Sequence, residues 1–184
     1  KEFSERFSTL VSEWIRVGYC QGNFNSDNCA VGGFTLDYGP FGFIDMFDPR
    51  YQPWTGGGVH FSFLNQPVAA EINFDMFCLS IAPLLENDQV ALKKLEEIRD
   101  GFSDLMKKKM DQMWAKKLGV QSFDSEFFKE LIILMIETHV DYTIFFRELS
   151  NIPKDITPLE KSFYKHGTLN EDLRNRWSYW LEKW

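Results

Sequence analysis

The chain has 184 residues, including 18 Phe and 6 Trp, and a net charge of −7. This length is enough for one domain with a core, and the aromatic content favours a packed interior over disorder. The negative charge repels phosphate backbones and argues against nucleic-acid binding. The one dense basic run, at residues 107–109, is more typical of a solvated helix face than of a polyanion site.

The cysteines Cys20, Cys29 and Cys78 are odd in number and form no Cys-x-x-Cys pair, which argues against a structural zinc site. Reduced thiols favour an intracellular protein. No apolar stretch approaches the length that spans a bilayer, so we expect no membrane partner. The chain begins inside a helical pattern, and we expect it to be a fragment of a longer protein. The oligomeric state is left open.

The first two segments in chain order differ in character. Residues 2–17 carry one apolar stripe at helical spacing and predict a helix. Residues 18–63 hold nine of the 12 glycines and predict tight turns and loops. Within them, Ala30 to Leu36 predicts a short strand interrupted by two glycines.

The remainder of the chain has helical periodicity. Pro67 is suited to a first helical turn, and Pro83 predicts the end or a kink of that helix. Residues 88–118 predict a long amphipathic helix that ends at Gly119. A further helix is expected from a cap at Asp124 or Ser125 to about residue 149, and a last one over residues 170–184.

The fold class that follows is mainly α with a small β/loop module. We expect one domain over residues 1–184, with a catalytic and metal loop module at 18–63 and a helical bundle at 64–184.

The segment at residues 22–49 carries the polar side chains of interest. Asn25, Asp27 and Asn28 cluster in a loop, and Asp37 opens a Tyr-Gly-Pro turn nine residues after Asn28, with two further aspartates at positions 45 and 48. Mg²⁺ prefers oxygen ligands and takes one or two from protein, the rest from phosphates and water. Protein kinases use an Asn and an Asp from two such loops, a pattern that Asn28 and Asp37 match.

Asp27 beside this pair is a candidate general base on an incoming hydroxyl, or a residue that orders the loop. In a kinase catalytic loop the base lies five positions before the metal-binding Asn, and that position here is Asn23, which cannot serve as a base. Because Asn, Asp and Gly are also the commonest turn formers, plain turns remain an equal alternative from this pattern alone.

Other candidate groups are better explained as structural. His60, His139 and His166 are scattered along the sequence, and His139 is expected in or near the core. Cys29 has no visible His partner for nucleophilic activation. The stripe of Trp177, Trp180 and Trp184 predicts core or a docking face rather than a ligand cage.

Three strings within residues 22–49 resemble the signature of the selenoprotein O family. They are Asn-Ser-Asp-Asn at 25–28, Leu-Asp-Tyr-Gly-Pro-Phe-Gly-Phe-Ile-Asp at 36–45, and Asp-Pro at 48–49. A weaker likeness continues to the closing Trp-rich helix. Gln21 and Asn23 depart from the family's usual His and Val.

The resemblance implies the C-lobe of a protein-kinase-like, pseudokinase fold that transfers AMP from ATP to protein Ser, Thr or Tyr hydroxyls (AMPylation). By matching position, Asn28 and Asp37 would bind Mg²⁺ or Mn²⁺, Asp37 would also lie by the ATP phosphates, and Asp27 would accept the proton. The family's N-terminal lobe, with its nucleotide loop, is absent from this chain. Alone, therefore, the chain is expected to bind nucleotide poorly.

Two other functions stay open: a kinase-like helical binding module without catalysis, and a phosphotransferase that uses the γ-phosphate. The resemblance also implies a mitochondrial location in a eukaryote and a cytoplasmic one in a bacterium. The protein substrate cannot be read from the sequence.

Overall fold

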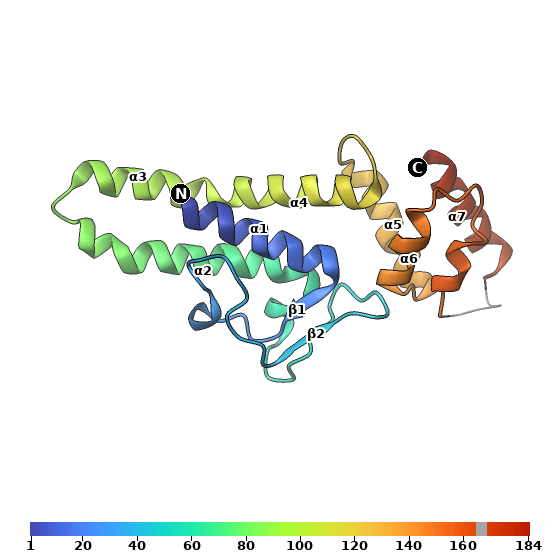
Figure 1. Ribbon diagram of the computed structural model, residues 1–184, viewed down its shortest axis with the longest axis horizontal. Coiled ribbons are helices and arrows are strands. Elements are labelled where there is room, and N and C mark those ends of the chain that lie inside the picture. Colours follow the sequence, from blue (N-terminus) through green and yellow to red (C-terminus); the bar gives the residue numbers. More distant parts are fainter. Residues whose placement is uncertain (165–168) are drawn as a thin grey trace. The chain divides into compact units, whose positions relative to one another are not determined.

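The computed structural model describes residues 1–164 and 169–184, which are mainly helical with a small two-stranded sheet (Figure 1). The α-helices are α1 (Glu2–Val17), α2 (Gln66–Ile81), α3 (Gln89–Asp100), α4 (Phe102–Leu118), α5 (Ser125–Thr138), α6 (Tyr142–Leu149) and α7 (Glu171–Lys183). Strand β1 (Tyr19–Gln21) pairs antiparallel with β2 (Phe41–Phe43). The predicted mainly helical class with a small β element is confirmed, and its identity as a kinase-like C-lobe stays a prediction.

The chain divides into two compact units, with a boundary inside α4. The first comprises Lys1–Phe43 and Pro49–Met110, and the second comprises Ile44–Asp48 and Asp111–Trp184. The three predicted site residues all belong to the first unit. The expected single domain with a loop module and a bundle stays a prediction.

The first predicted helix is confirmed as α1. Its side chains Phe7, Val11 and Ile15 are fully buried, and burial of each such side chain stabilises the fold by about 1.5–3 kcal/mol. Gly18 ends the helix with φ 79°, a left-handed conformation that glycine adopts without a steric penalty. Helix α1 packs alongside α2, and the small sheet follows it in the chain (Figure 1).

Aromatic rings form much of the core of the first unit. Phe74 of α2 stacks on Phe102 of α4 with ring centroids 4.2 Å apart. Phe24, from the loop after β1, lies 5.9 Å from Phe7 and 5.2 Å from Trp14, measured between ring centroids. The loop that bears the candidate site is therefore anchored in the same core as the helices.

The strand expected from Ala30 to Leu36 is wrong. Those residues form a turn closed by a single antiparallel bridge between Cys29 and Thr35. Gly33 adopts φ 72°, which turns the chain back within a few residues and leaves no room for a strand ladder. The regular strands lie on either side, in β1 and β2.

Two helices expected to be continuous are interrupted. The break in residues 88–118 falls at Gly101, which caps α3 with its N–H on the carbonyl of Glu97. The break before residue 149 falls at His139, which has φ 53° and ends α5. Asp141 then starts α6 by accepting a hydrogen bond from the N–H of Ile144 at 2.8 Å. The apolar side chains keep their helical spacing through both breaks, so the sequence pattern did not predict either one.

Other boundaries are confirmed. Pro67 lies in the first turn of α2, which ends at Ile81. Gly119 follows α4 with φ 70°, and Asp124 caps α5. Lys109 of the basic run pairs with Glu5 at 3.1 Å, and its neighbours at 107 and 108 are exposed, as expected for a helix face.

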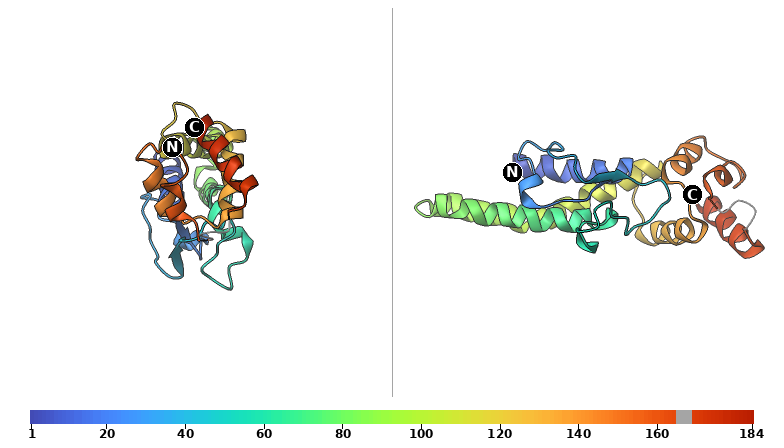
Figure 2. Two further views of the ribbon diagram at one scale, coloured as in Figure 1. Left: turned by 90° about the vertical axis from the view of Figure 1, so that its right-hand side faces the viewer. Right: turned by 90° about the horizontal axis from the view of Figure 1, so that it is seen from below.

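The second unit contains α5, α6 and α7, which lie close together in Figure 2. Trp177 and Trp180 are buried in its core, and Trp180 stacks on Phe127 with centroids 5.0 Å apart. Trp184 is half-buried and donates from Nε1 to the carbonyl of Leu118 at 2.7 Å. The tryptophan stripe is thus core rather than a ligand cage. His166 lies outside the described residues.

The sequence analysis expected no apolar stretch long enough to span a bilayer, and that expectation is wrong. In the described residues one helical run, Phe63–Leu85, is long and apolar enough to cross a membrane by length and composition, with a mean hydropathy of 1.5. Glu71 and Asp75 interrupt its apolar sequence, so the sequence pattern did not predict it. The core helix of a water-soluble protein can pass the same test, so this run is weak evidence for a membrane.

Candidate functional site

Strand β1 is fixed by the buried side chain of Gln66, at the start of α2. Its Oε1 accepts a hydrogen bond from the backbone N–H of Gln21 at 2.8 Å. Its Nε2 donates to the carbonyls of Tyr19 at 3.0 Å and Phe63 at 3.1 Å. Gln66 is 0% exposed, so these bonds form away from water, where an unmade bond would be costly. The end of β1, from which the candidate loop departs, is held in place.

The loop after β1 is held at two points. Phe24 is fully buried, and its carbonyl accepts a hydrogen bond from Nδ2 of Asn73 on α2 at 2.7 Å. Oδ1 of the same Asn73 accepts from the hydroxyl of Ser26 at 2.8 Å. One buried amide therefore ties down both ends of the stretch that leads into the short 3₁₀ turn Ser26–Asn28.

Asn28 is half-buried, and its side chain is oriented by its own loop. Nδ2 donates to the carbonyl of Asn23 at 2.7 Å. This bond fixes the orientation of the amide group, with its nitrogen toward Asn23 and its oxygen away from it. The carbonyl oxygen Oδ1, the atom that would bind a metal, is left for another role. Asp27, beside it, is exposed to solvent.

The turn between the two loops is attached to α1. Thr35 accepts a hydrogen bond from Nε1 of Trp14 at 2.9 Å. Gly33 lies so close to α1 that an added Cβ would stand 2.5 Å from Cβ of Arg6. A side chain at Gly33 would push the turn off the helix, because φ 72° and this contact both require glycine.

The backbone of Asp37 is held by a residue of β1. Its carbonyl accepts a hydrogen bond from Nε2 of Gln21 at 3.0 Å, and its Oδ1 accepts from the N–H of Gly39 at 3.2 Å. The N–H of Gly22 donates to the carbonyl of Pro40 at 3.0 Å. Gln21 therefore joins the start of one loop to the Asp-Tyr-Gly-Pro turn of the other.

The bridge between Cys29 and Thr35 brings the two loops together. Asn28 precedes the bridge by one residue on one arm, and Asp37 follows it by two residues on the other. Counted outward from this single antiparallel bridge, Asn28 stands opposite Leu36, and Asp37 stands one position further out, opposite Asp27. The predicted pair thus occupies two adjacent arms of one turn.

The remaining aspartates of the segment belong to the second unit. The carbonyl of Asp45 accepts a hydrogen bond from the N–H of Tyr142 at 2.8 Å, and Met46 forms a bridge with Asp141. Asp48 follows in the same short stretch.

The donor set on the two arms fits a hard cation. One amide oxygen and one carboxylate are the number and type of protein ligands that Mg²⁺ commonly takes when phosphates supply others. Among the described residues, no group of three or more His, Cys, Asp or Glu side chains is arranged to hold a metal. An all-protein metal cage is therefore not offered by these residues, whereas a shared protein–phosphate site fits Asn28 and Asp37.

Cys29 next to this pair is not an activated nucleophile. Burial, with a further contribution from the charge of Asp27, raises the pKa of its thiol from 9.0 to about 12. Its Sγ lies 3.4 Å from the carbonyl of Asn25, to which it donates. The thiol is protonated at neutral pH, which agrees with the structural interpretation made from the sequence.

Four residues that hold the site were not assigned a role from the sequence: Gln21, Phe24, Gln66 and Asn73. A signal existed for Asn73. Asn73 is a lone amide between Ile72 and Phe74 on an apolar helix, and such a residue must find a buried partner. Its partner, the carbonyl of Phe24, is 49 residues away in the sequence, and no local pattern identifies it.

Comparison with known proteins places the chain in a family. The family model described as protein adenylyltransferase SelO matches residues 1–184. The chain is 34% identical over 183 residues to a protein nucleotidyltransferase YdiU of Aromatoleum aromaticum, covering 94% of this chain and 34% of that protein. It is 30% identical over 192 residues to one of Flavobacterium johnsoniae, covering 98% of this chain and 36% of that protein.

A third relative, from Variovorax paradoxus, is 37% identical over 155 residues, covering 80% of this chain and 30% of that protein. The chain thus spans about a third of the length of the curated relatives it matches. The match over the whole of residues 1–184 shows that the chain belongs to the SelO family of protein adenylyltransferases.

Proposed function

We propose that this chain is the part of a protein adenylyltransferase that carries the catalytic loop, in a kinase-like C-lobe. The observation that supports it most directly is the bridge between Cys29 and Thr35, which sets Asn28 and Asp37 on adjacent arms. The hydrogen bond from Asn28 to the carbonyl of Asn23 supports it further, because it leaves the amide oxygen for a cation.

In the proposed reaction a Ser, Thr or Tyr hydroxyl of a substrate protein attacks the α-phosphorus of ATP. The new oxygen–phosphorus bond forms as the bond from the α-phosphorus to the α–β bridging oxygen breaks, and pyrophosphate leaves. Asp27 accepts the hydroxyl proton, and its exposure makes it accessible to a protein substrate. A bound Mg²⁺ or Mn²⁺ would neutralise charge on the phosphates. Asn28 and Asp37 would hold it, and Asp37 would also lie by the ATP phosphates.

The position of Asn23 favours attack at the α-phosphate over a conventional kinase reaction. Asn23 lies five residues before Asn28, where a kinase base would stand, and an amide cannot accept the proton. Its carbonyl is instead used to orient Asn28. Transfer of the γ-phosphate and a binding module without catalysis are the two alternatives.

The test replaces the matched third of the Aromatoleum relative with residues 1–184 and supplies ATP labelled at the α-phosphate. We expect label on protein, lost in Asp37→Ala and retained in Asp104→Ala, which removes an exposed carboxylate of α4. Label transfer that persists in Asp37→Ala contradicts the site. Transfer from γ-labelled ATP instead indicates a phosphotransferase. Failure to bind Mg²⁺–ATP at all indicates the binding module.

A further inference from the structure

The outward side of α2 carries an apolar stripe, here called the α2 stripe. It consists of Val68, Ile72, Met76 and Leu79, which are 47–56% exposed. Their spacing of four, four and three residues places them on one face of the helix. The opposite face packs on α1. A helix that is apolar on both faces is normally covered on both, and half-exposed apolar side chains in a row mark an interaction surface.

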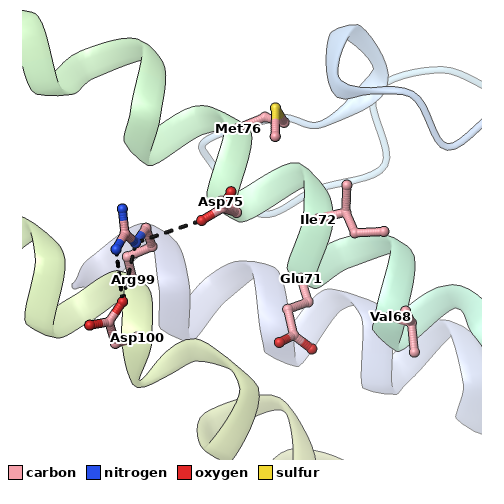
Figure 3. Close-up of a pocket in the computed structure, with 7 residues that line it drawn as sticks. All are labelled: Val68, Glu71, Ile72, Asp75, Met76, Arg99 and Asp100. Atoms are coloured by element: carbon pink, nitrogen blue, oxygen red, sulfur yellow. Dashed lines mark hydrogen bonds and ion pairs between the residues drawn. The ribbon is translucent and has the colours of Figure 1, made fainter.

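A groove of about 500 Å³ runs beside the stripe, between α2 and the end of α3 (Figure 3). It is lined by Val68, Glu71, Ile72, Asp75, Met76, Arg99 and Asp100. Arg99 lies 3.6 Å from a carboxylate oxygen of Asp75 and 3.1 Å from one of Asp100. In Figure 3 Asp75 points toward Arg99, whereas Ile72 and Met76 point away from it.

The charge of the groove indicates what covers it. Three carboxylates and one guanidinium line the groove, and that guanidinium is already shared between Asp75 and Asp100. The edge of the stripe is therefore acidic, with Glu71 outside the Arg99 network. Basic side chains on a partner would meet complementary charge there, which favours correct encounter and register.

The same charges disfavour two other occupants. A second copy of this chain packed face to face would bring acidic edges together, and like charges at an interface oppose association. A lipid surface would place Glu71 and Asp75 in or near hydrocarbon, where carboxylates are costly, and anionic headgroups would repel them.

We propose that the α2 stripe is a docking surface for an amphipathic α-helix with an apolar face and Lys or Arg along the edge that meets Glu71. We assign this helix to the polypeptide that longer family members carry outside the matched region. The match covers 34% of the Aromatoleum relative, so 66% of that protein lies outside it. The proposal does not depend on AMP transfer.

The chemistry is tested with two labelled peptides of roughly 18 residues, about five helical turns. Both have the same Leu/Ile face, and one has Lys edges and the other Glu edges. By fluorescence anisotropy with residues 1–184, the Lys peptide should bind at least tenfold more tightly than the Glu peptide. Ile72→Glu should weaken binding of the Lys peptide at least tenfold, and Glu71→Lys should reverse the preference between the peptides.

The matched control is Val90→Glu, at an exposed apolar position of α3 outside the stripe, which should leave peptide binding unchanged. Circular dichroism and urea unfolding verify that each variant folds. Equal binding of the two peptides, or binding that Ile72→Glu leaves intact, overturns the proposal.

The origin of the docking helix is tested by labelling the Met76→Cys variant with a maleimide. The labelling rate of the unsubstituted chain, which has its own cysteines, is subtracted as background. We expect labelling at least tenfold slower in the Aromatoleum chimera than in residues 1–184 alone. Equal rates overturn the assignment to the family's additional polypeptide. Dimers in sedimentation, or binding to phosphatidylcholine or phosphatidylserine vesicles, would overturn the helix proposal if Ile72→Glu abolished them. Because no arm uses ATP, failure here is distinguishable from failure of the proposed function.

Discussion

The segment between β1 and β2 contains few regular backbone hydrogen bonds, whereas α2 is an unbroken helix of 16 residues. Yet the irregular segment is the one secured from several sides, by Phe24, by the Asn73 amide and by Gln21. Helix α2 is covered on one face and leaves its stripe half exposed. Regular structure and tertiary anchoring are thus separate properties. A loop with polar chemistry needs buried contacts to hold its shape, because its own backbone supplies few.

Removal of the aromatic anchor should have the largest effect. We expect Phe24→Ala to lower the free energy of unfolding by about 3–5 kcal/mol, because a fully buried ring is lost and a cavity remains. Urea unfolding measures it. Phe34→Ala, in the same segment but 57% exposed, is the control and should change stability little. Equal effects would mean that the loop is not anchored through Phe24.

Loss of the Asn28 amide should separate activity from stability. In the Aromatoleum chimera, Asn28→Ala should reduce AMP transfer roughly a hundredfold or more, because a metal ligand is removed. Stability should fall by only about 1 kcal/mol, the value of one hydrogen bond. Asn25→Ala, an exposed position of the same loop, should retain most activity. If both variants were equally active, the assignment of Asn28 would be wrong.

The buried glutamine should matter next. Gln66→Leu leaves the N–H of Gln21 and two carbonyls without their partner, and we expect a loss of about 2–3 kcal/mol. Thermal and urea unfolding both report it. Gln89→Leu, which changes an exposed amide in α3, should lie within about 0.5 kcal/mol of the unsubstituted chain. A neutral Gln66→Leu would contradict the role of this side chain in holding β1.

A smaller effect is expected from pH at Cys29. Burial raises its pKa from 9.0 to about 12 in the folded chain, so the unfolded chain loses the proton first as pH rises. The thiol's contribution to stability is therefore complete below pH 9 and is lost between pH 9 and about 12.

Unfolding measured at pH 8 and pH 10 tests this. The decline in stability between the two should be about 1 kcal/mol smaller in Cys29→Ala than in the unsubstituted chain. An identical decline in both would show that the thiol ionises as readily when folded.

The smallest effect should come from the α2 stripe. Ile72→Gln should change the free energy of unfolding by no more than about 0.5 kcal/mol, since the side chain is 56% exposed. Phe74→Ala, two residues along on the covered face, should cost about 3–5 kcal/mol. A loss above about 2 kcal/mol in Ile72→Gln would show that the stripe is already covered within residues 1–184.

Patterns within short stretches predicted much of the helical framework. The stripe of residues 2–17, Pro67, Gly119 and Asp124 each marked a boundary that the structure confirms. The breaks at Gly101 and His139 were not predicted, because the apolar period continues across them. The strand predicted at Ala30–Leu36 was wrong for a different reason. Contacts of this segment with α1 hold it as a turn, and they overrode its local strand preference.

The sequence by itself determined the family, most of the helices and the identity of the polar residues at 27, 28 and 37. These rest on local spacing and on strings that are readable without a partner. Only the tertiary structure decided that Asn28 bonds to Asn23, that Gln21 meets Asp37, and that Asn73 secures the loop from α2. The contact of Asn73 joins positions 49 residues apart, and the chain must fold before such a pair can meet.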